Sequence, residues 1–176
     1  MFNRKQLVIL MTAATMGGAF VSANAATPAT APTANAVIQT PLSIVENTPM
    51  DFATIAPDGG GGTVTLDTAD GIAPVVGFVL SGTPASGLFT VTGEGGLSYA
   101  ISFGAGSFTL NKIAPVGPET LTLNNLQASG GLTHTITGLG TQTDTFKVGG
   151  DLLIGSGPAA AAGVYQGSYT VQVDYQ

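Results

Sequence analysis

Cysteine and tryptophan are absent from the sequence and histidine occurs once, which limits the chemistry that the chain can perform. Without cysteine there is no thiol nucleophile and no disulfide, and the usual zinc sites need several histidines or cysteines. No serine occupies a Gly-x-Ser-x-Gly elbow. His134 shares a strand face with Leu132 and Ile136, which favours a partly buried structural role. We therefore expect no enzymatic activity, no metal and no cofactor.

Two further motifs are weak candidates for ligand sites. Asp67 and Asp70 suggest calcium, but the regular oxygen ligands and the closing Glu of an EF-hand are missing, so a solvated turn is the better interpretation. The glycine run at residues 59–62 lacks the Lys and the following helix of a phosphate-binding loop. A flexible hairpin connection explains this run.

Charged residues are also scarce, because only 4 Lys+Arg and 10 Asp+Glu occur among 176 residues, for a formal net charge of −6. General attraction to nucleic acid or to anionic lipid needs clustered Lys and Arg, so both partners are excluded as general targets. The low charge does not imply disorder, since 44% of the residues are hydrophobic and can form the core of one domain.

Glycine and proline are abundant, with 26 and 10 residues, and both are poor helix formers. Short runs rich in β-branched residues alternate with Gly- or Pro-containing turns, and no stretch has a convincing helical stripe. The high threonine content suits a pleated, half-solvated surface. The sequence therefore predicts an all-β protein, an antiparallel two-sheet sandwich.

Residues 1–25 have the pattern of an export signal peptide. Arg4 and Lys5 precede a mostly apolar run of 15 residues, and small residues at Ala23 and Ala25 suit a signal peptidase. A membrane-spanning helix needs about 20 apolar residues, so an uncleaved anchor is the less favoured alternative. We expect cleavage after Ala25 and export through the periplasm. The mature chain then has two lysines against ten acidic residues, a charge of −8.

Residues 26–45 are expected to form an extended N-terminal arm ahead of a sandwich domain at residues 46–176. The arm is uncharged up to residue 41, and three prolines disfavour a helix. Small and apolar residues recur at every second position, although Val37 lies on the opposite face. This alternating set comprises Ala34, Ala36, Ile38, Leu42 and Ile44. An ordinary first strand and a linker with chance alternation are the other interpretations of the arm.

The C-terminal residues 164–175 show the clearest strand pattern. From Tyr165 onward the apolar and aromatic residues occupy odd positions and the polar ones occupy even positions, so that one face suits a core and the other suits water. If this strand lies at a sheet edge, its unpaired backbone groups can pair with another strand. A normal edge or inner strand would have the same pattern.

Three segments of the chain carry a family resemblance. They are Met50-Asp51-Phe52-Ala53-Thr54-Ile55 followed by Gly62-Thr63-Val64-Thr65, then Phe89-Thr90-Val91-Thr92-Gly93, and then Phe146-Lys147-Val148-Gly149-Gly150-Asp151-Leu152 leading to Gly163-Val164-Tyr165-Gln166-Gly167. Together these segments resemble secreted bacterial proteins of the domain-of-unknown-function family 4402. The similarity covers most of residues 42–176, with Ala53 where a Gly is expected, and the family implies no biochemical function.

The C-terminal strand is also similar to that of chaperone-usher pilus subunits, because Gly163 is fourteenth from the C-terminus and Tyr175 is penultimate. This resemblance implies an immunoglobulin-like, pilin-like sandwich that lacks its final strand and accepts a strand from a neighbouring subunit. The implied acceptor residues are Gly163, Tyr165, Tyr169, Val171, Val173 and Tyr175. The implied donor is the alternating set of the arm.

From this second resemblance we expect a structural subunit of a surface fimbria or related fibre. Its partners would be neighbouring copies or related subunits, a periplasmic chaperone and an outer-membrane usher. Its location would be the cell surface, a fimbrium or the extracellular space. The alternative is a self-complete secreted β-sandwich that acts as a surface or biofilm-matrix binding protein, with residues 34–44 folded into their own domain.

Overall fold

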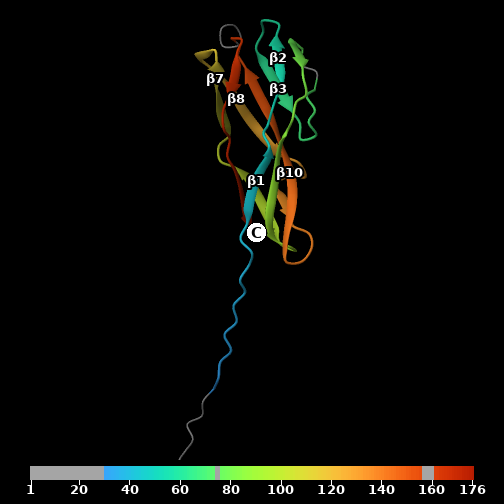
Figure 1. Cartoon of the computed structure of the whole chain (residues 1–176), viewed down its shortest axis with the longest axis vertical. Helices are drawn as coiled ribbons and strands as arrows, with labels where there is room; N and C mark the ends of the chain where they lie inside the picture. Colours follow the sequence, from blue (N-terminus) through green and yellow to red (C-terminus); the bar gives the residue numbers. More distant parts are fainter. Residues whose placement is uncertain (1–29, 74–75, 156–160) are drawn as a thin grey trace, which may run out of the picture. The chain divides into compact units, whose positions relative to one another are not determined.

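The computed structural model describes residues 30–73, 76–155 and 161–176, so the expected signal peptide lies outside the described residues. The chain divides into two units, residues 1–36 and residues 37–176. The described residues of the first unit, 30–36, are exposed and have no regular secondary structure. All the strands of the described chain belong to the second unit (Figure 1).

The second unit is all-β, as the sequence predicts, and the described residues contain no helix. Consequently, none of them forms a helix with the length and apolar character needed to cross a membrane. The strands are β1 (Ser43–Thr48), β2 (Thr54–Pro57), β3 (Gly62–Leu66), β4 (Phe78–Ser81), β5 (Gly87–Glu94), β6 (Ser98–Phe103), β7 (Ser107–Ala114), β8 (Val116–Ala128), β9 (Thr133–Thr135), β10 (Thr141–Ile154), β11 (Val164–Gln166) and β12 (Val171–Tyr175).

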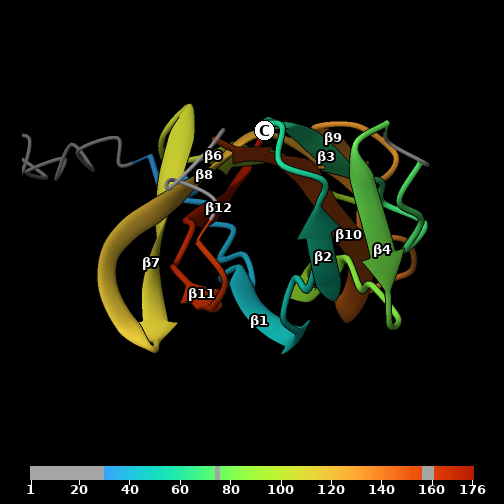
Figure 2. The same ribbon diagram turned by 90° about the horizontal axis from the view of Figure 1, so that it is seen from above.

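The strands form an antiparallel sandwich whose larger layer is a seven-stranded sheet in the order β1-β5-β10-β8-β7-β11, with β3 also paired to β10. The opposite layer has two parts, a three-stranded sheet in the order β12-β6-β9 and the pair β2-β4. In the view from above, β11 and β2 lie on opposite sides of β1 (Figure 2). No pairing between described strands joins β12-β6-β9 to β2-β4, so the smaller layer consists of two separate sheets.

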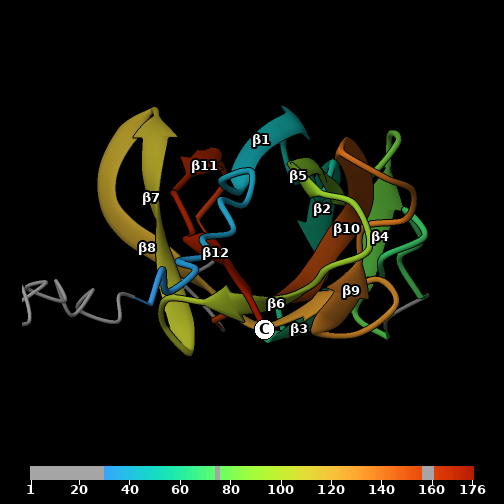
Figure 3. The same ribbon diagram turned by 90° about the horizontal axis from the view of Figure 1, so that it is seen from below.

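Two clusters of apolar side chains fill the sandwich. The first packs β3, β8 and β10 against Phe52 and the β2-β4 pair, and the second packs β5 and β10 against β6. Figure 3 shows these strands from below. Met50, Leu126 and Tyr169 pack against both clusters. These three partly buried side chains join the two halves of the core.

Strand β10 belongs to both halves because it changes partners along its length. Its N-terminal part pairs with β5 as far as Val148, and its C-terminal part pairs with β3 from Gly150 onward. A side chain at Gly149 would collide with the backbone of Leu66 and Asp67, so this position requires glycine. The two glycines, Gly149 and Gly150, thus lie where β10 changes its partner from β5 to β3.

The single C-terminal strand expected over residues 164–175 is wrong in one respect, since the chain forms two strands in two sheets. β11 pairs with β7 in the large sheet, and β12 pairs with β6 in the three-stranded sheet. The predicted alternation nevertheless holds, because the side chains of Tyr165, Tyr169 and the odd positions of β12 are partly buried while the even positions are exposed. A period-two pattern sets which face is buried but does not specify the sheet.

Candidate functional site

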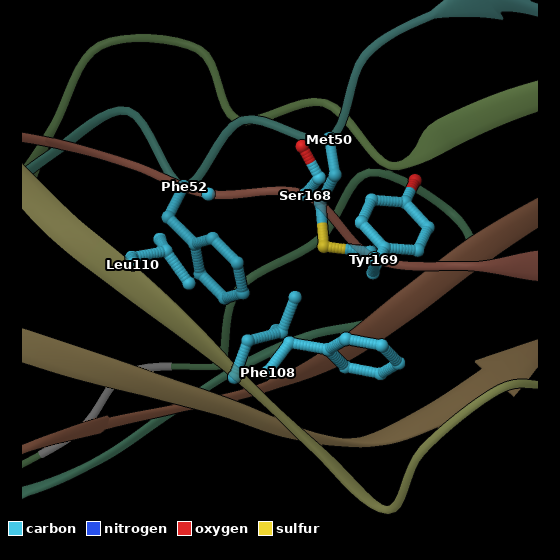
Figure 4. Close-up of a pocket in the computed structure, with 8 residues that line it drawn as sticks. Met50, Phe52, Phe108, Leu110, Ser168 and Tyr169 are labelled. Atoms are coloured by element: carbon cyan, nitrogen blue, oxygen red, sulfur yellow. The ribbon is translucent and has the colours of Figure 1, made fainter.

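An apolar pocket lies where the chain passes from β11 to β12. Its volume is about 50 Å³, and apolar side chains from three parts of the fold surround it (Figure 4). The lining residues are Met50, Phe52, Phe108, Leu110, Leu123, Gly167, Ser168 and Tyr169. Gly167 approaches the backbone of Thr109 and Leu110 so closely that a side chain there would collide with them. The crossing segment therefore forms one wall of the pocket.

Tyr169 is the most constrained residue of this wall. Its ring makes edge contacts with Phe89 and Phe108, at centroid distances of 6.2 and 6.3 Å. Its hydroxyl is buried and makes no hydrogen bond within the described part of the chain. Burial is the main cause that raises the pKa of Tyr169 above its usual value, and the negative charge of the nearby Glu46 carboxylate raises it further. An unpaired buried hydroxyl costs roughly 1–3 kcal/mol of folding free energy, so the Tyr169 hydroxyl destabilises the isolated domain.

The pocket adjoins the start of β2 and the end of β11, two strands that each have a partner on one side only. Within the described chain, β11 pairs with β7 alone and β2 pairs with β4 alone. Met50 and Phe52 precede β2, while residues 167–169 follow β11, so the two walls of the pocket continue into these two strands. Each strand has unpaired backbone donors and acceptors on its free side, to which another strand could bind.

The predicted acceptor residues divide into two groups. Gly163 precedes β11, Tyr165 lies within it and packs against the first core cluster, and Tyr169 lines the pocket. In contrast, Val171, Val173 and Tyr175 belong to β12 and pack against the second cluster. Of these six residues only Tyr169 lines the pocket, and β12, like β11, pairs with a single strand of the described chain. The expectation that these six residues accept a strand stays a prediction.

The predicted donor residues also divide. Ala34, Ala36 and Ile38 are exposed and lie outside any strand, and Ile38 is 95% exposed. Leu42 packs beside β1 and Ile44 lies in it, and both contact the second core cluster of their own domain. Residues 43–45, assigned to the arm from the sequence, thus pair with β5. The segment free to reach another chain ends before Leu42.

Three hydrogen bonds fix the point at which the chain enters the domain. The Tyr175 hydroxyl donates to the Thr40 carbonyl over 2.8 Å and accepts from the Glu94 amide over 2.6 Å. The Thr40 hydroxyl donates to the Glu94 carboxylate over 2.6 Å. We call Thr40, Glu94 and Tyr175 the arm clasp. It anchors residue 40 beside the C-terminal end of β12.

A family model for a domain of unknown function, DUF4402, matches residues 42–175. The chain belongs to the DUF4402 family. The match confirms the first of the two resemblances seen in the sequence, and it begins two residues after the clasp residue Thr40, at the start of the folded strands. No curated protein and no solved structure significantly matches the chain.

The polar network of the DUF4402 domain surrounds its one histidine. The Asp144 carboxylate oxygen lies 2.9 Å from His134 Nδ1 and accepts a hydrogen bond of 2.8 Å from the Tyr99 hydroxyl. His134 Nε2 lies 2.8 Å from the Ser129 carbonyl oxygen. Burial, together with the Asp144 hydrogen bond, raises the pKa of Tyr99. Both ring nitrogens thus have partners within the domain, as expected for a structural histidine.

Asp67 and Asp70, the two aspartates considered for calcium, hold the turn between β3 and β4 through hydrogen bonds and an ion pair. Asp67 Oδ1 accepts backbone hydrogen bonds from Ala69 and Gly71, both over 2.7 Å. Asp70 forms an ion pair with Lys147 and accepts from Ser86, and the Lys147 hydrogen bond is the largest cause that lowers the pKa of Asp70. Within the described ranges, no three His, Cys, Asp or Glu residues gather closely enough to hold a metal ion.

Sequence reasoning missed the pocket residues outside the C-terminal segment, namely Met50, Phe52, Phe108, Leu110 and Leu123. Their alternation in short strands is visible in the sequence, but it only predicts that they face a core. Whether a core-facing residue lines an incomplete region depends on which strands pair. The sequence offers no signal for that pairing.

Proposed function

We propose that this DUF4402 protein is a structural subunit of a bacterial surface fimbria or related fibre. In this proposal the exposed arm of one copy adds a strand to the sandwich of the next copy, between β11 and β2. The observation that carries the proposal is the apolar pocket beside the ends of β11 and β2, each of which has one free backbone edge. Strand addition supplies hydrogen bonds to such edges and side chains to such a pocket.

The arm has the properties that a donated strand needs. It carries no charge up to residue 41, and its described residues 30–39 are exposed. Burying the exposed Ile38 side chain in a neighbour would contribute about 1.5–3 kcal/mol. A subunit that gives its arm to one neighbour and accepts an arm from another makes head-to-tail contacts, and these extend into a fibre when they do not close into a ring.

Export and assembly partners follow from the same proposal. A subunit with an incomplete apolar region needs a temporary cover during export, which a periplasmic chaperone would supply before an outer-membrane usher passes the subunit to the cell surface. The free edge of β11 beside the pocket is the surface that such a chaperone would cover.

Val37 and Ile38 provide a matched test because they are adjacent, are 89% and 95% exposed, and point to opposite faces when the chain is extended. We expect Ile38→Asp to reduce fibre yield sharply and Val37→Asp to leave it near the wild-type value. Both substitutions should change the unfolding free energy of the isolated subunit by no more than about 0.5 kcal/mol. Equal fibre yields for the two variants would contradict donor-strand assembly in this register.

The second candidate function is a self-complete secreted binding protein of the cell surface or biofilm matrix. The observation in its favour is that Leu42 and Ile44 pack into the core of their own domain. Light scattering distinguishes the two functions. A monomer that stays stable without a chaperone, at every concentration tested, would favour the binding protein.

A further inference from the structure

Three exposed apolar side chains gather at one end of the second unit. Ile113 lies opposite Val116 across the β7-β8 pair, and Val164 lies opposite Ala114 across the β7-β11 pair. Their exposed fractions are 46%, 88% and 56% for Ile113, Val116 and Val164. We call these three residues the tip patch. It adjoins the start of β11, whose free edge leads to the pocket.

The tip patch and the arm clasp lie at opposite ends of the domain. Strand β10 connects the two ends, because Thr141 pairs with the clasp residue Glu94 and Leu153 pairs with Thr122 of β8. Twelve residues of extended strand separate these positions on β10, a distance of about 40 Å. Val116 lies six residues before Thr122, still farther from the clasp, as the positions of the C-terminus and of β7 and β8 illustrate (Figure 1).

We infer that the tip patch receives Ile38 of a second copy of this chain, an inference that rests on the proposed function. In a head-to-tail fibre, the clasp end of one copy meets the tip end of the next. Ile38 is two residues from the anchored Thr40, a reach of about 7 Å. It therefore extends only to the rim of the neighbour, where the tip patch offers exposed apolar side chains beside the free edge of β11.

This arrangement fixes the direction and register of the added strand. β11 runs from the tip patch toward the pocket, whereas the arm enters at the patch with its C-terminal residues, so the two are antiparallel. Ala34 is four residues from Ile38, and Ser168 at the pocket is four residues from Val164. Both separations are about 13 Å in extended chain. With Ile38 beside Val164, Ala34 lies over the pocket, whose small volume suits an alanine.

The absence of cysteine allows a direct test by cross-linking. A double variant with Ile38→Cys and Val116→Cys, and a second one with Ile38→Cys and Val164→Cys, are assembled and mildly oxidised. A disulfide needs Cβ atoms about 3.5–4.5 Å apart, so it reports close contact. We expect a ladder of covalent oligomers in non-reducing gels from at least one of them. Ile38→Cys with Leu132→Cys is the control, because Leu132 is exposed but directly precedes β9 of the three-stranded sheet, outside the patch.

Accessibility of a single cysteine provides a second measurement. Val116→Cys alone should react with a maleimide in the monomer and be protected in the fibre. Fibres with no ladder from either patch variant, or with Val116→Cys as reactive as in the monomer, would overturn the inference and leave the proposed function standing. Fibres that form equally well without the arm would overturn the proposed function itself.

Discussion

Replacing Tyr169 by phenylalanine should stabilise the isolated subunit, although most substitutions in a core destabilise it. The Tyr169 hydroxyl is buried without a hydrogen-bond partner, so Tyr169→Phe removes an unpaired polar group and keeps the ring contacts with Phe89 and Phe108. The same change at Tyr175 removes a hydroxyl that makes two hydrogen bonds, to Thr40 and Glu94. The two variants are chemically identical changes in opposite environments.

The expected magnitudes follow from these environments. Relief of an unsatisfied buried group, which costs about 1–3 kcal/mol, should raise the unfolding free energy of Tyr169→Phe by about 1 kcal/mol. Tyr175→Phe loses two hydrogen bonds of roughly 0.5–1.5 kcal/mol each and leaves the Glu94 amide unpaired, so we expect a loss of about 2 kcal/mol. With a urea slope of about 2 kcal/mol per molar, the midpoints should move by roughly +0.5 M and −1 M.

Urea unfolding of monomeric subunits, followed by tyrosine fluorescence and circular dichroism, measures both shifts. Wild-type protein at the same concentration is the reference. If Tyr169→Phe lowers the unfolding free energy by about 1 kcal/mol or more, the hydroxyl has a hydrogen-bond partner. That result would refute the assignment of an unpaired hydroxyl to the pocket wall. Two equal shifts would refute the contrast between the pocket wall and the arm clasp.

Two further predictions concern the domain itself. The pKa of Asp70 is lowered chiefly by the Lys147 hydrogen bond. The ionised Asp70 carboxylate therefore stabilises the fold fully above the ordinary aspartate pKa of about 4, and this stabilisation is lost as the pH falls below that value. Asp70→Asn should therefore reduce the acid dependence of the urea midpoint, and a dependence as steep as that of the exposed-site control Asp174→Asn would contradict this. Gly87→Ala should cost about 1–3 kcal/mol, because the new methyl group would collide with the Tyr169 hydroxyl. Gly106→Ala is the control in thermal unfolding, since no atom lies within 4 Å of its added Cβ, and equal melting temperatures for the two would show that Tyr169 moves freely.

Much of the fold follows from local sequence patterns. The glycine and proline content and the short alternating runs predict an all-β sandwich, and the side chains of Tyr165, Tyr169 and the odd positions of β12 are partly buried, as the alternation predicts. The structural role expected of His134 also fits its two ring contacts. These features depend on the side-chain period of a strand, which is a local property.

The division of the C-terminal segment could not be predicted in the same way. Whether residues 164–175 stay in one sheet depends on the partners β7 and β6, which are distant in the sequence. The same limit applies to Leu42 and Ile44, whose alternation suits a donated strand and an internal strand equally. Their pairing with β5 depends on long-range contacts, and so does the pocket.

The most direct test of donor-strand assembly is removal of the arm alone. A variant lacking residues 26–39 keeps Thr40, the arm clasp and all of β1, so the domain should fold with wild-type stability. Purified alone, it should form no fibres. Mixed with full-length subunits, it should still accept an arm but donate none, and electron microscopy should show fibres that shorten as its proportion rises. Fibres of normal length and yield from the deleted variant alone would contradict the account.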